Sequence, residues 1–306
     1  MTIEHTHRHD HHHATTGRAR LAIVLALTST VLAIQLIGAV TSGSLALLAD
    51  AGHMFTDAAG LALALFAAVL AARPPTPRRT WGFLRAEVLA AGAQATVLLL
   101  VGGFVLVEGI GRLIDPPGVA PVPMAAFGGV GLVGNLIAVA VLATADRQSL
   151  NLRAAFLEVV NDALGSASVI VAALLISLTG WTRFDAVASL LIAVLIVPRT
   201  LGLLRESVGV LLESTPPGLD LDAVRAHILG VSHVVGVHDL HATLVATGLP
   251  VLTAHVIVDD GCFHDGCVPQ LLDALQTCLA GHFDVGHSTF QIEPAAHAEH
   301  EHAHHA

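Results

Sequence analysis

The sequence contains no lysine and no tyrosine, and only 12% of its 306 residues are charged. Without lysine there is no Gly-x-x-x-x-Gly-Lys phosphate loop, so coupling to ATP through that motif is excluded. The 14 basic residues, all arginine, are outnumbered by 24 acidic residues, and the net charge is -10. This balance excludes an extended basic surface, and we expect no nucleic-acid partner.

Cysteine is also scarce: Cys262, Cys267 and Cys278 all lie near the C-terminus. An odd, clustered count without a secretion signal argues against a disulfide framework, so we expect three reduced thiols facing the cytoplasm. The first 16 residues are polar and rich in histidine, unlike the basic segment of a signal peptide. We therefore interpret the apolar run from Leu21 as a retained first membrane span.

What the chain has in excess is hydrophobic residues, at 54%, with a mean hydropathy of +0.73. A bilayer core is crossed by about 20 apolar helical residues. Six stretches meet this requirement: about 20–40, 45–71, 86–110, 122–144, 154–179 and 184–204. The predicted fold is therefore an all-α bundle of six transmembrane helices, followed by a small α+β domain.

Arginine in the short loops predicts the orientation of the bundle. Nine arginines lie on the side of the termini: Arg8, Arg18 and Arg20 before span 1, Arg73, Arg78, Arg79 and Arg85 between spans 2 and 3, and Arg147 and Arg153 between spans 4 and 5. The opposite loops carry only Arg112 and Arg183. Positive residues concentrate on the cytoplasmic side. We expect a multi-pass protein of the cell inner (plasma) membrane with both termini in the cytoplasm.

After Pro216 and Pro217 the pattern changes to that of a soluble domain. It predicts a ferredoxin-like αββαβ order: helix 220–229, strands 234–246 and 251–258, helix 268–281 and strand 285–293. The predicted domains are a His-rich tail (1–19), the transport domain (20–212), a metal-responsive domain (213–294) and a second His-rich tail (295–306). Two interpretations of the tails stay open, low-affinity metal collection and simple solvated chain.

Ionisable residues inside a membrane span are costly and point to function. His53 and Asp57 lie four residues apart in the second span, and Glu158 and Asp162 do so in the fifth, so each pair shares one helix face. Two such faces opposed would form a four-ligand cage suited to a divalent cation such as Zn²⁺. The alternative is isolated polar residues satisfied by neighbouring helices, but buried like charges require a counter-ion.

Several separated stretches together carry a resemblance to one known family. They are SLALLADAGHMFTD (44–57), RTWGFLRAE (79–87), EVVNDALGS (158–166), VHDLH (237–241), AH (254–255) and GHSTFQIE (286–293). These stretches resemble the cation diffusion facilitators, and the resemblance covers nearly the whole chain.

The resemblance implies a homodimer that exports Zn²⁺ or a related cation such as Cd²⁺ or Co²⁺ in exchange for protons, by alternating access. It implies a transporter, not an enzyme, with no cofactor beyond the cation that is its substrate and possible regulator. It also implies a tetrahedral transport site on His53, Asp57, Glu158 and Asp162.

One departure concerns Glu158, because zinc members of the family usually have histidine at this position. The site is therefore richer in oxygen, and an exporter of broader specificity, or one that prefers Mn²⁺ or Fe²⁺, is the alternative. A membrane metal sensor is an alternative from a different class. Ligands at mid-membrane on two helices argue against it, because a sensor does not need them. An intramembrane metalloenzyme lacks its His-Glu-x-x-His motif.

The resemblance further implies a regulatory metal site in the cytoplasmic domain at His238, His255 and His287. Ordinary surface histidines are the alternative. Cys262, His264 and Cys267 place three soft donors within six residues, a spacing that matches no standard zinc finger. Whether these three bind metal is left open by the sequence.

Overall fold

The computed structural model describes residues 29–143 and 150–298. Its contacts divide the chain into two compact units, Met1–Ala62 with Gln94–Gly202, and Leu63–Ala93 with Leu203–Ala306. The long helices α2, α3 and α6 therefore contribute to both units. The paragraphs below treat each unit by itself.

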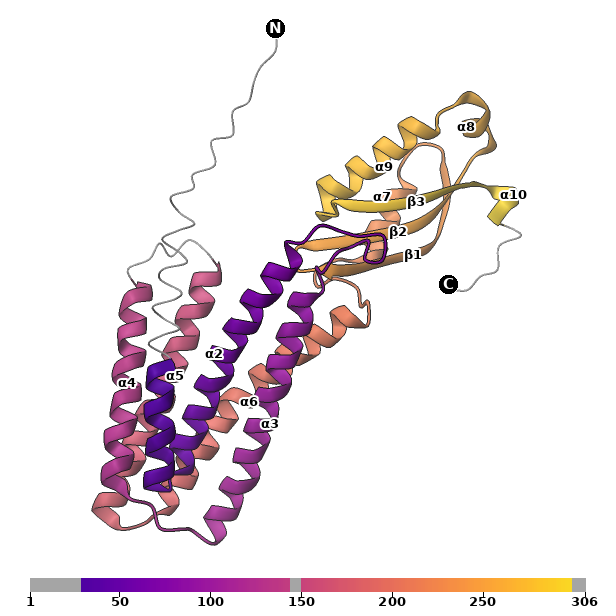
Figure 1. The fold of residues 1–306 in the computed structure, drawn as a ribbon. Helices are drawn as coiled ribbons and strands as arrows, with labels where there is room; N and C mark the ends of the chain where they lie inside the picture. The colour runs from indigo at the N-terminus through magenta and orange to yellow at the C-terminus, as the bar shows by residue number, and fades with distance from the viewer. Residues whose placement is uncertain (1–28, 144–149, 299–306) are drawn as a thin grey trace. The chain divides into compact units, whose positions relative to one another are not determined.

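The membrane part consists of long apolar helices (Figure 1). A helix at Ser29–Ser42 is followed by α2 (Leu45–Ala71), α3 (Ala86–Ile114), α4 (Pro121–Ala143), α5 (Leu150–Thr179) and α6 (Arg183–Leu211). Within the described residues, these five labelled helices are long and apolar enough to cross a membrane, and Ser29–Ser42 is a shorter apolar helix. The bundle agrees with the predicted fold, although the start of the first span, 20–28, lies outside the described residues.

Small residues allow the helices of the first unit to approach closely. Ala46 and Ala49 of α2 and Ala172 and Ala173 of α5 are buried in one apolar cluster. On the helix Ser29–Ser42, a Cβ added to Gly38 would lie 2.3 Å from Cγ of Phe127 on α4. Close packing of this kind is what holds helices together in lipid, where apolar burial gives no net drive.

The C-terminal domain contains α7 (Leu221–Leu229), β1 (Val234–Ala246), β2 (Leu249–Val258), α8 (Asp260–Asp265), α9 (Val268–Phe283), β3 (His287–Pro294) and α10 (Ala295–Ala298). The predicted αββαβ order is confirmed, and the two short helices α8 and α10 are additions. β1 and β2 form an antiparallel hairpin around Gly248, whose φ of +75° suits glycine. The helical crossover through α9 makes β3 parallel to β2.

Both long helices of this domain cover the same face of the sheet. Alternate residues of β2, such as Leu252 and Val256, are buried against Val224 of α7 and Leu275 of α9. Because successive strand residues point to opposite faces, the residues between them lie on the face without these helices. His255 is one of these, and its position matters for the second candidate site.

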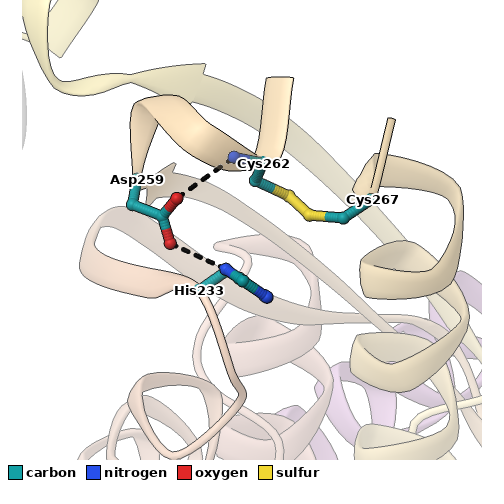
Figure 2. Close-up of a disulfide and its surroundings, with 4 residues drawn as sticks. All are labelled: His233, Asp259, Cys262 and Cys267. Carbon is teal, nitrogen blue, oxygen red and sulfur yellow. Dashed lines mark hydrogen bonds and ion pairs between the residues drawn. A yellow bond between two sulfur atoms is a disulfide. The ribbon is translucent and has the colours of Figure 1, made fainter. Parts of the chain in front are cut away.

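The expectation of three free thiols is wrong for two of them. Cys262 and Cys267 form a disulfide (Figure 2). Cys278 is free. The reason is local geometry: α8 ends at Gly266 in the left-handed conformation and returns the chain, which brings the two Cα atoms to 5.0 Å. That separation lies within the range disulfides require. The two sulfurs, which flank His264 in the sequence, are bonded to each other and are therefore not available as metal ligands.

Candidate metal centres

The first candidate site joins α2 and α5 within the first unit. Nε2 of His53 lies 2.9 Å from Oδ1 of Asp162 and 3.5 Å from Oδ2 of Asp57. One ligand atom from each residue lies within 4.8 Å of the other two. The three side chains are only 11–22% exposed. Two carboxylates and an imidazole therefore converge in a nearly closed space.

Glu158, the fourth predicted ligand, lies on α5 one turn before Asp162. Its side chain is outside the described residues, so its ligand role stays a prediction. His53 also borders a small apolar cavity against α3 and α6, and its Nδ1 is buried without a hydrogen-bond partner among the described residues. Among the described residues, the polar contacts of this imidazole are therefore at Nε2, the nitrogen that faces the carboxylates.

Asp50, one turn before His53, belongs to a different network. Its carboxylate is 2% exposed and accepts hydrogen bonds from Nε2 of Gln35 at 2.7 Å and Oγ of Ser166 at 2.9 Å. Asn135 of α4 donates to the same serine oxygen at 3.2 Å. This chain of polar groups connects four helices and holds α2 against α5, so Asp50 supports the site and lies outside the ligand group.

A second buried carboxylate fixes the start of α2. Asp185 of α6 accepts hydrogen bonds from Oγ of Ser44 at 2.5 Å and from the backbone N–H groups of Leu45 and Ala46 at 2.8 and 3.1 Å. Ser44 in turn caps the helix by accepting from the N–H of Leu47 at 3.1 Å. The unpaired donors at a helix N-terminus attract an anion, so Asp185 anchors the helix that carries His53 and Asp57.

The second candidate site lies on the face of the sheet opposite α7 and α9. Glu293 of β3 is 2% exposed, and its Oε1 lies 2.7 Å from Nε2 of His238 and 3.5 Å from Nδ1 of His255. The register explains the grouping, because His238 of β1 pairs with His255 of β2, which neighbours β3. A nearly buried carboxylate with two imidazoles is a plausible ligand set for Zn²⁺ by donor chemistry.

Further donors surround this cluster. The register of β1 shifts between His238 and His241, and Asp239 there adopts a φ of +47°, which brings its Oδ2 to 3.7 Å from Nε2 of His255. His297 of α10 places Nε2 at 3.7 Å from Oε2 of Glu293. A metal held here would thus have more than one choice of fourth ligand.

The structure does not bring His287 to this cluster. It lies at the other end of β3, opposite Val251, and its ring contacts Trp81 edge-on with centroids 5.0 Å apart. The sequence prediction did not include Glu293 in this cluster. The available signal was its alternation on β3, which places it on the same face as His287 but six residues further along, closer to His255.

Comparisons with known proteins identify the family of both parts of the chain. Residues 21–212 match the family model of the cation efflux transmembrane domain, and residues 216–295 match that of the cation efflux protein cytoplasmic domain. The chain is 40% identical over 296 residues to the metal cation efflux system protein CzcD of Cupriavidus metallidurans, covering 96% of this chain and 91% of that protein.

Two further relatives carry related names. The zinc transporter ZitB of Escherichia coli is 37% identical over 295 residues, covering 96% of this chain and 93% of ZitB. The cadmium, cobalt and zinc/H(+)-K(+) antiporter of Bacillus subtilis is 35% identical over 266 residues, covering 86% and 85%. These relatives are named as metal cation transporters, which agrees with the prediction that this chain is not an enzyme. This chain is a multi-pass membrane protein that belongs to the cation efflux family.

Proposed function

We propose that this protein exports Zn²⁺, or a related divalent cation such as Cd²⁺ or Co²⁺, from the cytoplasm across the inner membrane in exchange for protons. The observation that carries the proposal is the convergence of His53, Asp57 and Asp162 inside the membrane bundle. Carboxylates gathered in a low-dielectric setting are unfavourable unless protons or a cation balance them.

This balance supports coupling between the cation and protons. A ligand set binds metal only in its deprotonated form, so an entering cation releases protons and a departing cation allows them to return. With Glu158 completing the set, the site alternates between a protonated and a metal-bound state. The names of the relatives, which include a zinc transporter and a cadmium, cobalt and zinc/H(+)-K(+) antiporter, support the same exchange.

In the proposal the proton gradient drives net export, and alternating access carries the cation from one side of the membrane to the other. The ligands come from two different helices, α2 and α5, so a relative movement of these helices could open the site to one side at a time. The arginine distribution supports cytoplasmic termini, and the match to a cytoplasmic-domain family model supports a cytoplasmic sheet domain. In the proposal the protein acts as a homodimer.

The cytoplasmic cluster of His238, His255 and Glu293 is proposed as a regulatory cation site. Its donors are partly accessible, since His238 and His255 are 34% and 21% exposed. A cation bound here would neutralise the nearly buried Glu293 and tie β1, β2 and β3 together. The occupancy of this cluster would therefore depend on the cytoplasmic cation concentration independently of the transport site.

Flux into proteoliposomes tests the proposal. Purified protein should accumulate Zn²⁺ under an imposed proton gradient, and a proton-sensitive dye should report the counterflow. Asp162→Asn retains the size of the side chain and removes its charge. Loss of a partner of a metal ligand alone costs about 10–100-fold in affinity or activity, so we expect loss of a direct ligand to lower flux by about 100-fold or more.

Glu206→Gln, a charge change on α6 outside the ligand group, is the matched control and should retain flux. Wild-type flux in Asp162→Asn would contradict the site assignment. Zn²⁺-dependent binding without any flux in the wild type would instead favour a membrane metal sensor.

A further inference from the structure

Two histidines on the helical side of the C-terminal domain lie ring to ring. His227 is on α7 and His282 is on α9, both are exposed, and their ring centroids are 5.1 Å apart with the planes tilted by 46°. Below them, Ile228 and Leu279 are fully buried in the domain core. The pair therefore rests on a packed helix–helix contact, on the other side of the sheet from His238, His255 and Glu293.

Each ring makes the same kind of local hydrogen bond, to the backbone carbonyl four residues earlier, and this bond sets its orientation and tautomer. Nδ1 of His227 contacts the carbonyl oxygen of Ala223 at 2.9 Å, and Nδ1 of His282 contacts that of Cys278 at 2.9 Å. A carbonyl oxygen only accepts, so each Nδ1 donates its hydrogen. In the neutral ring Nε2 then carries the lone pair, which is the arrangement that metal-binding histidines have when a carbonyl orients them.

The spacing of the rings also fits a shared cation. Two imidazoles that bind one tetrahedral cation through Nε2, at the usual bond lengths, have ring centroids roughly 5 Å apart. The observed separation of 5.1 Å matches this value. Phe283 packs edge-on against His227 at 4.9 Å and restricts the ring to this orientation.

We propose that His227 and His282 form a two-imidazole binding site for a first-row divalent cation, of which Zn²⁺ is the probe chosen here. Imidazole suits Zn²⁺, Co²⁺, Ni²⁺ and Cu²⁺ better than the harder Mg²⁺ or Ca²⁺. Two protein ligands leave the remaining coordination positions to water or to the ligands of a carrier. Such a site exchanges its cation rapidly, unlike a closed structural site with four protein ligands.

Histidine-selective acylation with diethyl pyrocarbonate tests the site in the full chain, because peptide mass spectrometry reads each histidine separately from the others. Zn²⁺ alone should lower the labelling of His227 and His282 several-fold and in parallel, and a chelator should restore it. His227→Ala should abolish the Zn²⁺ protection of His282, since a single imidazole binds far more weakly. Alanine is the best helix former, so this exposed change on α7 preserves the fold.

His233→Ala is the matched control, because His233 is exposed in the same domain and its Nδ1 pairs with Asp259 instead. It should leave the protection of His227 and His282 unchanged. Two results would overturn the proposal: unaltered labelling of His282 when Zn²⁺ is added to the wild type, or protection of His282 that persists in His227→Ala. Both readouts are independent of transport, so they stand or fall separately from the proposed export.

Discussion

At the residue scale, the proposed ligand at position 158 would influence which cation the membrane site prefers. His53, Asp57 and Asp162 supply one nitrogen and two carboxylates, and Glu158 would add a third carboxylate. Oxygen-rich sites suit harder cations, whereas imidazole favours Zn²⁺. In the proposal, the choice between glutamate and histidine at position 158 would therefore tune cation selectivity without altering the other three positions.

Glu158→His should increase discrimination for Zn²⁺ against Mn²⁺, by about tenfold if one ligand change is worth about 1.4 kcal/mol between the two ions. It should also move the pH dependence of flux, because one carboxylate is exchanged for a group that titrates near neutrality. The measurement is a competition series with both cations in proteoliposomes at several pH values. Identical series for the two proteins would remove Glu158 from the ligand set.

A second residue-scale effect concerns Asp259, which accepts a hydrogen bond from His233 at 2.8 Å and caps α8 through the N–H of Cys262 at 3.1 Å (Figure 2). The bond from His233 lowers the pKa of Asp259 below its ordinary value of 3.8. A depressed carboxyl pKa stabilises the folded state above the unfolded pKa, and this contribution is lost as the pH falls through the folded value.

Asp259→Asn retains a capping side chain but removes the charge. We expect faster amide hydrogen exchange in α8 of the variant than in the wild type at pH 6, and no difference once the pH is well below 3.8. Exchange would be compared between the two proteins at the same pH by mass spectrometry. A difference that is equally large at both pH values would mean that charge is not its cause.

At the scale of elements, α2 is held at its N-terminus by Asp185 and near its middle by Asp50. Each carboxylate is buried and accepts more than one hydrogen bond, so each links α2 to other helices by a charge-assisted contact. The candidate ligands His53 and Asp57 follow Asp50 by one and two turns. We infer that the position of His53 depends on both anchors.

Asp185→Ala should destabilise the protein by about 2 kcal/mol or more, because it leaves buried donors at Ser44, Leu45 and Ala46 without an acceptor. Equilibrium unfolding in mixed micelles measures the loss. Ser44→Ala, which removes only one of the three donors, should have a smaller effect. Equal losses in the two variants would show that Asp185 acts through the serine alone.

At the scale of the whole molecule, the proposal assigns the membrane bundle to transport and the sheet domain to regulation. The two candidate sites use different elements, α2 and α5 in one unit and β1, β2 and β3 in the other. Loss of a transport ligand should abolish flux, whereas loss of a regulatory ligand should alter only its dependence on cation concentration.

His238→Ala combined with His255→Ala should therefore raise the Zn²⁺ concentration for half-maximal flux, by up to about tenfold, and leave the maximal flux in place. The concentration dependence of flux in proteoliposomes decides this. His241→Ala, on the same strand but outside the three-residue cluster, is the control. A loss of maximal flux in the double variant would mean that the cluster is required for transport itself.

The sequence by itself determined the membrane class, the approximate extent of the five labelled spans and the order αββαβ. Each of these depends on local pattern: apolar runs as long as a bilayer is thick, a Pro-Pro break, and alternation along strands. The i,i+4 pairs of α2 and α5 likewise indicated the membrane site, because helix periodicity alone puts both members of a pair on one face. Their ligand roles remain predictions to be tested by flux.

Only the tertiary structure decided which residues from different elements meet. Glu293 joins His238 and His255 because the parallel register of β3 places it beside them, and the same register carries His287 away to Trp81. The left-handed turn at Gly266 pairs Cys262 with Cys267, and the packing of α7 on α9 brings His227 to His282. Periodicity fixes the face on which a side chain lies, but register, turns and helix packing fix its partner, and these are set by contacts between segments distant in the sequence.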